Sequence, residues 1–163
     1  MDQFWMSLRL LLLLALANTA PLFAKRWLGT RWSAALDGGA RFFDGRPLLG
    51  PSKTLRGLVA SIGATALGAP ALGLPWTTGA LIGAGAMLGD ALSSFVKRRL
   101  GQSPSSRATG LDQIPEALLP LLAVQASLGL TLWQIAAITI TFFALEIPLA
   151  RLFHNLGLRD RPY

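Results

Sequence analysis

Four polar side chains lie near the end of a strongly apolar segment, at a spacing that suits a helix. They are Asp90, Ser93, Ser94 and Lys97, at positions i, i+3, i+4 and i+7. Residues at this spacing share one face of an α-helix. A carboxylate within an apolar helix is costly, so it usually faces a polar cavity and has a functional role. The simpler alternative is an ion pair that holds the helix end in place.

A second carboxylate, Asp112, stands just before the next apolar segment, at the same side as Asp90. Mg²⁺ prefers one or two carboxylates together with phosphate oxygens, so this pair could hold Mg²⁺ on a polyphosphate. The chain has no cysteine, and its one histidine, His154, lies in the C-terminal tail. Thiolate chemistry is therefore excluded, and a Ser-His-Asp arrangement is not expected.

The loop before residue 57 is richer in glycine and cations than a simple connection requires. Glycines allow turns whose N–H groups can face an anion, and Lys53 and Arg56 could contact phosphate oxygens. Gly45 and Gly50 have the spacing of a P-loop, but Pro51 and Ser52 come between Gly50 and Lys53, so the Walker pattern is not met. A loop that contacts lipid headgroups through its cations is the alternative interpretation.

These residues need elements that position them, and apolar windows supply those elements. About 20 mostly apolar residues cross a bilayer as a helix. Such windows occupy residues 4–24, 57–74, 76–96, 114–130 and 132–150. We therefore expect an all-α, polytopic integral membrane protein with about five transmembrane helices, in one membrane-embedded domain over residues 1–163. A cleaved signal peptide is the alternative for the first window, but Asp2 and the further apolar windows argue against it.

The third window contains glycines in pairs four residues apart. Gly79 and Gly83 form one pair, and Gly85 and Gly89 form the other. In a bilayer this spacing allows helix backbones to approach closely. We therefore interpret these glycines as packing residues.

Composition and charge agree with a membrane protein. The 163 residues are 52% hydrophobic and 14% charged, with a mean hydropathy of +0.49 and a net charge of +7; soluble domains carry about 25% charged residues. Five alternating helices place 14 of the 15 lysines and arginines on one side. The positive-inside rule then predicts cytoplasmic loops and an external N-terminus. We expect a multi-pass protein of the plasma (inner) membrane. Nucleic-acid binding is not expected, because it needs a water-exposed basic face.

The order of several motifs resembles that of the CDP-archaeol synthase family, which is related to the CDP-diacylglycerol synthases (phosphatidate cytidylyltransferases). The matching stretch of residues 89–99 reads Gly-Asp-x-x-x-Ser-Phe-x-Lys-Arg-Arg and is followed by Leu111-Asp112-Gln113. In the first half the matches are Ala17-Asn18 with Pro21, Asp44-Gly45-Arg46, Leu49-Gly50, Lys53-Thr54 and Arg56-Gly57. The resemblance covers most of the chain.

This resemblance implies five membrane helices and a cytidylyltransferase. Cytidylyl would pass from CTP to an archaeol-type ether-lipid phosphate with Mg²⁺, giving a CDP-lipid and pyrophosphate. By position, Asp90 and Asp112 would be metal carboxylates and, with Lys97, catalytic residues. The implied nucleotide- and phosphate-binding residues are Asn18, Asp44, Arg46, Lys53, Thr54, Arg56, Ser93, Ser94 and Arg98.

The chain departs from the related synthases at one acidic position. Those enzymes carry a second acid three residues after the first, but here that position is Pro115, followed by Glu116. The glycine-histidine element of the diacylglycerol branch is replaced by Arg-Ala-Thr-Gly at residues 107–110. Three alternatives follow: Glu116 substitutes as a metal ligand, one metal contact is absent, or this subgroup works differently.

The proposed chemistry needs no general base. A lipid phosphate is already an anionic nucleophile, so the barrier lies in bringing anions together and neutralising the leaving charge. The expected partners are CTP, a lipid phosphate and the bilayer, and a homodimer is left open. The alternative functions are a CDP-diacylglycerol-type synthase acting on phosphatidate and a non-catalytic membrane protein for lipid binding or transport.

Overall fold

The computed structural model describes residues 3–103, 106, 108, 110–155 and 157. Their helices are α1 (Gln3–Leu28), α2 (Leu55–Ala71), α3 (Trp76–Arg99), α4 (Gln113–Leu128) and α5 (Leu132–Asn155). Outside these helices, the regular pairing among the described residues consists of isolated β-bridges in the first long loop. The expectation of an all-helical chain is confirmed, and each helix coincides with one apolar window.

Three of the helices, α1, α3 and α5, are long and apolar enough to cross a membrane. The other two are shorter, with 17 residues in α2 and 16 in α4. At a rise of about 1.5 Å per residue, these two helices are about 24 to 26 Å long. The membrane character is therefore clear from three helices, whereas length alone does not make α2 and α4 membrane spans.

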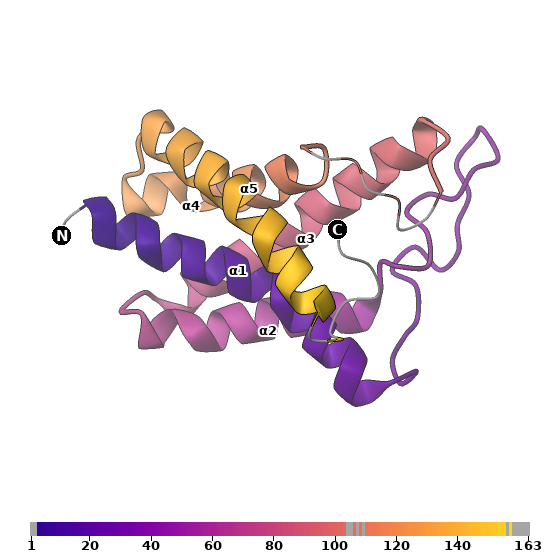
Figure 1. The fold of residues 1–163 in the computed structure, drawn as a ribbon, viewed down its shortest axis with the longest axis horizontal. Helices are drawn as coiled ribbons and strands as arrows, with labels where there is room; N and C mark the ends of the chain where they lie inside the picture. The colour runs from indigo at the N-terminus through magenta and orange to yellow at the C-terminus, as the bar shows by residue number, and fades with distance from the viewer. Residues whose placement is uncertain (1–2, 104–105, 107, 109, 156, 158–163) are drawn as a thin grey trace.

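The helices form a bundle in which successive helices run in opposite directions (Figure 1). α3 packs between α2 and α4, α1 packs on α2 and α3, and α5 crosses over α4 and α1. As a result, the loop over residues 29–54 and the two ends of the connection between α3 and α4 lie at one end of the bundle, and the short turns lie at the other. The core draws its fully buried leucines largely from α1, including Leu10, Leu13 and Leu14.

The first glycine pair of α3 lies against α2. A Cβ on Gly79 would collide with the backbone of Thr65, and a Cβ on Gly83 would lie 2.8 Å from the Cα of Ile62. Real Cβ atoms do not approach backbone this closely. The packing interpretation of this pair is confirmed.

The second glycine pair faces the opposite neighbour, α4. A Cβ on Gly85 would lie 2.6 Å from the Cα of Pro120, and a Cβ on Gly89 would collide with the carbonyl of Pro115. α3 therefore uses one glycine pair for each neighbour. The contact at Gly89 lies at the loop end of the bundle, where the predicted site residues are.

Candidate active site at the loop end of the bundle

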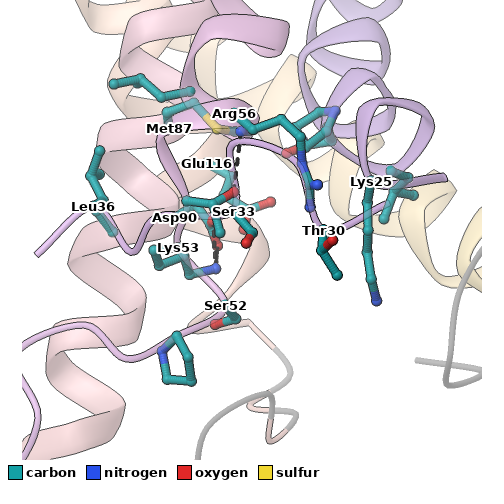
Figure 2. Close-up of a pocket in the computed structure, with 18 of the residues that line it drawn as sticks. Lys25, Thr30, Ser33, Leu36, Ser52, Lys53, Arg56, Met87, Asp90 and Glu116 are labelled. Atoms are coloured by element: carbon teal, nitrogen blue, oxygen red, sulfur yellow. Dashed lines mark hydrogen bonds and ion pairs between the residues drawn. The ribbon is translucent and has the colours of Figure 1, made fainter. Parts of the chain in front are cut away.

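A cavity of about 590 Å³ opens at the loop end, between α1, α2, α3, α4 and the first long loop (Figure 2). Its size is within the range of small-molecule sites. Six of the predicted site residues line it: Asn18, Lys53, Thr54, Arg56, Asp90 and Glu116. Further polar lining comes from Lys25, Thr30, Ser33 and Ser52.

Lys53 and Asp90 form the central ion pair of this cavity. The Nζ atom of Lys53 donates to both carboxylate oxygens of Asp90 at 2.5 Å (Figure 2). The side chains are 19% and 24% exposed, so water reaches both. The pair joins the loop before α2 to α3, which means that Asp90 does not pair within its own helix end.

Glu116 brings a second carboxyl group to the same place. It lies in the first turn of α4, is buried, and its carboxyl is within hydrogen-bonding reach of Asp90. Two carboxylates this close repel each other unless a proton or a cation lies between them. The position of Glu116 fits the alternative in which this residue takes the place of the missing acid at Pro115.

The oxygen atoms of Asp90 and Glu116 suit Mg²⁺, which is a hard cation. In the part of the chain that the structure describes, no three His, Cys, Asp or Glu side chains gather as a metal cage. Mg²⁺ in nucleotide sites is commonly held by one or two carboxylates and substrate phosphates, so a cage is not required. The residues present therefore fit the ion.

The loop that carries Lys53 is held by its own backbone. The N–H of Leu36 donates to the carbonyl of Lys53 at 2.7 Å, and residues Ala35 and Thr54 form a bridge. Thr54 then caps α2, because its Oγ1 accepts from the N–H of Gly57 at 3.2 Å. Thr54 thus lines the cavity and also fixes where α2 begins.

Asp37 organises the turn just before Lys53. Its carboxylate accepts from the N–H groups of Leu49 at 2.8 Å, Gly50 at 3.1 Å and Gly39 at 3.0 Å. Burial opposes the charge on this carboxylate, but the three N–H donors outweigh burial and lower the pKa of Asp37 below its ordinary value. The turn is therefore built around an ionised carboxylate.

Arg56 and Asn18 line the cavity, and each carries a buried donor atom. Nη1 of Arg56 donates to the carbonyls of Gly29 and Arg31, at 2.5 and 3.1 Å, which ties the end of α1 to α2. Nε of Arg56 and Nδ2 of Asn18 are buried and have no hydrogen-bond partner among the described residues. Both groups are donors, so an anion in the cavity would complete their bonding.

Lys97 and Asp112 form a separate cluster that does not line this cavity. Nζ of Lys97 lies 2.6 Å from Asp112 and donates to the carbonyl of Ser106 at 2.9 Å. The neighbouring Arg98 is buried, and its Nε and Nη1 have no partner among the residues described. Asp90 and Lys97 share one face of α3, about 10 Å apart along the helix axis. The structure therefore divides the two predicted metal carboxylates between two ion pairs.

Ser93 and Ser94 are buried and do not line the cavity. The hydroxyl of Ser93 donates to the carbonyl of Gly89 in its own helix at 2.8 Å. In such a bond, a buried hydroxyl has its hydrogen-bond partner in the backbone of its own helix. Both serines lie about one turn after Asp90 in α3, outside the lining of the cavity.

Asp44 and Arg46 lie outside the cavity, in a group of contacts with Arg99, Phe42 and Phe95 that we call the latch. Arg99 forms an ion pair with Asp44 at 2.6 Å, and its guanidinium stacks on the rings of Phe42 and Phe95, at 4.7 and 5.0 Å from their centroids. Arg46 in turn donates to the carbonyl of Arg99 at 2.6 Å. These contacts fasten the tip of the first long loop to the end of α3.

One carboxylate beside the site was not identified from the sequence. Glu146 of α5 lines a small cavity between α1 and α5, which Asn18 also lines. An isolated acid within an apolar segment was the signal that could have identified it. Its neighbour across this cavity, Asn18, also lines the larger one, so the two cavities share a wall.

Comparisons with known proteins agree on one family. A family model described as CDP-archaeol synthase matches residues 72–163. A CDP-archaeol synthase of Hyperthermus butylicus is 39% identical over 154 residues, covering 89% of this chain and 85% of the relative. That of Aeropyrum pernix is 35% identical over 170 aligned positions, covering 99% and 94%.

A solved structure is also similar, with a TM-score of 0.71 and 33% identity over 86% of this chain and 90% of the other. It is that of an intramembrane enzyme for the biosynthesis of archaeal membrane lipids. Fold, sequence and motif order thus lead to the same group of proteins, which are enzymes. The chain belongs to the CDP-archaeol synthase family and is a membrane cytidylyltransferase.

Proposed function

We propose that this chain transfers the cytidylyl group of CTP to the phosphate of an archaeol-type ether lipid, with Mg²⁺, and releases pyrophosphate. The names of the relatives support the product, a CDP-archaeol. The observation that carries the proposal is the cluster of Lys53, Asp90 and Glu116 in a polar cavity. Such a cluster combines the carboxylates and cations that a metal-bound triphosphate needs.

In the proposed step, an oxygen of the lipid phosphate attacks the α-phosphorus of CTP. A new P–O bond forms, and the bond between the α-phosphorus and the oxygen bridging to the β-phosphate breaks. The electron pair leaves with pyrophosphate, so no proton has to be removed from the nucleophile. Cationic side chains and positioned donors lower the repulsion between the reacting anions.

The cavity residues divide into carboxylates and donors. We assign Asp90 and Glu116 as ligands of Mg²⁺, which would supply charge neutralisation on the phosphates. Lys53, the Nε of Arg56 and the Nδ2 of Asn18 would bind phosphate oxygens. The donors reach the cavity from α1, α2 and the loop before α2, and the carboxylates reach it from α3 and α4.

We further assign the cluster of Lys97, Arg98 and Asp112 to the same reaction. Arg98 is buried with two donor atoms unpartnered among the described residues, as expected for a group that awaits an anion. Asp112 remains our second predicted metal carboxylate, and its pairing with Lys97 would have to open for it to reach Mg²⁺. Ser93, Ser94, Asp44 and Arg46 support the site through the helix and the loop that they hold.

We also propose a topology of five crossings in one domain over residues 1–163, in the plasma membrane. The first long loop and the two ends of the connection between α3 and α4 lie at one end of the bundle, which supports a common location of these loops in the cytoplasm and an external N-terminus. The shorter α2 and α4 would span through local thinning of the bilayer. Because the chain has no native cysteine, single cysteines at Phe43 and Thr131 can test this by labelling from each side of the membrane. Labelling of both from the same side would contradict the topology.

The activity is tested with purified protein, CTP and Mg²⁺, and lipid phosphates that differ in linkage and chain type. The expected result is pyrophosphate release and a CDP-lipid from the archaeol-type ether phosphate. Faster turnover of phosphatidate would instead favour the diacylglycerol-type alternative. An absence of pyrophosphate with every lipid phosphate would contradict the proposed function.

A further inference from the structure

Lys53 occupies both oxygens of the carboxylate that the proposed metal site needs. Its Nζ lies 2.5 Å from Oδ1 and from Oδ2 of Asp90. Glu116 is a further neighbour of Asp90, and its carboxyl is also in hydrogen-bonding reach. An ammonium group in this position offsets the repulsion between two carboxylates, which burial would otherwise strengthen.

Mg²⁺ and the ammonium group of Lys53 compete for the same carboxylate. Both are cations that would lie beside the two oxygens of Asp90, so they repel each other, and the ammonium group weakens the binding of Mg²⁺ there. A triphosphate in the same cavity would offer Lys53 new anionic partners. Mg²⁺ therefore competes with Lys53 for Asp90, and the triphosphate competes with Asp90 for Lys53.

The local structure allows the side chain to move while its backbone stays fixed. The carbonyl of Lys53 accepts from the N–H of Leu36 at 2.7 Å, and the backbone N–H of Lys53 donates to the carbonyl of Gly50 at 3.3 Å. The side chain is attached through four methylene groups and ends in a point charge with three donors. Such a side chain can change partners without a change in the loop.

We propose that Lys53 is an exchangeable counter-ion of Asp90: it holds the carboxylate in the nucleotide-free enzyme and passes to the phosphates when CTP binds, which frees Asp90 for the divalent cation. This inference rests on the proposed function and adds a dependence between the binding of CTP and the binding of the divalent cation. CTP and the divalent cation bind with positive coupling, and the coupling is reciprocal. Lys53 is therefore in contact with Asp90 or with phosphate, and not with both at full strength.

The first experiment measures the cation without nucleotide. Mn²⁺ is the probe, and free Mn²⁺ is measured by electron paramagnetic resonance over the nucleotide-free protein. Lys53→Met should bind Mn²⁺ at least tenfold more tightly than the wild type, and Lys53→Arg more weakly, because arginine holds a carboxylate with two parallel bonds. The control is Lys25→Met, which removes the same charge from the cavity wall, away from Asp90 (Figure 2). It should change the affinity less than threefold.

The second experiment measures CTP binding in EDTA by calorimetry. Lys53→Met should weaken CTP at least fivefold. Asp90→Asn should bind CTP more tightly than the wild type, because the ammonium group is then already released. Removal of a negative charge favours an anion even without an exchange, so the same change is also made in the Lys53→Met background. The gain should shrink there, whereas a lysine that serves only as a fixed phosphate ligand would leave it the same.

The outcomes separate this inference from the proposed function. Unchanged Mn²⁺ affinity in Lys53→Met, or weaker CTP binding in Asp90→Asn, overturns the exchange while lipid turnover by the wild type stands. Loss of CTP binding in the wild type overturns both. The Mn²⁺ measurement on Lys53→Met and Lys53→Arg does not depend on whether the Asp90 variant folds.

Discussion

Gly89 of α3 lies directly against the backbone of Pro115 of α4, and the next residue of each helix carries a carboxyl group of the candidate site. A Cβ on Gly89 would also lie 2.7 Å from the backbone nitrogen of Glu116. The absence of a side chain at this crossing is what lets the carboxyls of Asp90 and Glu116 meet. The packing of two helices and the chemistry of the site thus depend on one contact.

Gly89→Ala tests this dependence. The added methyl group must push α3 and α4 apart, and overpacking of this kind costs about 1 to 3 kcal/mol. We expect a lower melting temperature in detergent and at least a tenfold loss of pyrophosphate release. Gly63→Ala is the matched control, because a Cβ there meets nothing within 4 Å and α2 is helical at this point. Equal activity in the two variants would show that the close crossing does not position the carboxyls.

Glu116→Gln tests whether Glu116 replaces the acid that Pro115 displaces. The amide keeps the size of the side chain but loses a negative charge beside Asp90, so Mg²⁺ should bind more weakly. We expect at least a hundredfold lower kcat/KM, partly recovered at high Mg²⁺, with the melting temperature unchanged or higher. The assay is a Mg²⁺ titration of pyrophosphate release, and wild-type Mg²⁺ dependence in this variant would remove Glu116 from the metal site.

Asp90→Asn and Asp112→Asn test the two predicted metal carboxylates. Each change removes a charge from a different ion pair, with Lys53 or with Lys97. We expect both variants to lose CDP-lipid formation while remaining folded, as measured by product analysis and thermal unfolding. If only Asp112→Asn retains turnover, the reaction runs in the cavity of Lys53 and Asp90 alone.

The turn around Asp37 should make stability depend on pH at the acidic end. The folded-state pKa of this carboxylate is lowered, so its contribution is complete above the unfolded value, near pH 4, and is lost as the pH falls through the lower folded value. Asp37→Asn should therefore melt at a lower temperature than the wild type at pH 7, and the difference should shrink in acid. Thermal unfolding between pH 2.5 and 7 measures this, and a constant difference over that range would contradict it.

Arg99→Gln tests the latch between the first long loop and α3. The change removes the ion pair with Asp44 and the stacking of the guanidinium on Phe42 and Phe95. A cation–π contact is worth about 0.5 to 1 kcal/mol at an exposed site. We expect faster tryptic cleavage in the loop and a several-fold higher KM for CTP, with kcat little changed. Phe43→Ala is the comparison, because its fully exposed ring packs edge-on against Phe42 while the ring contacts of Arg99 are with Phe42 and Phe95. Cleavage of both variants at the wild-type rate would show that the latch does not hold the loop.

The sequence by itself determined the helices, their order and the family. Runs of apolar residues are local features, so the five helices fall on the five apolar windows. The glycine pairs of α3 were likewise readable as packing residues, because small residues at a spacing of four form a groove on any helix. The motif order identified the family before the partner of any side chain was known.

Only the tertiary structure decided which charges meet. Fifteen lysines and arginines are available to the acids, and nothing local selects Lys53 for Asp90 or Lys97 for Asp112. Those choices depend on the path of the loop before α2 and on the depth at which α3 packs against α4. The same crossing brought Glu116 into the cavity and left Asp112 outside it, because electrostatic partners are set by distances between elements that are far apart in the chain.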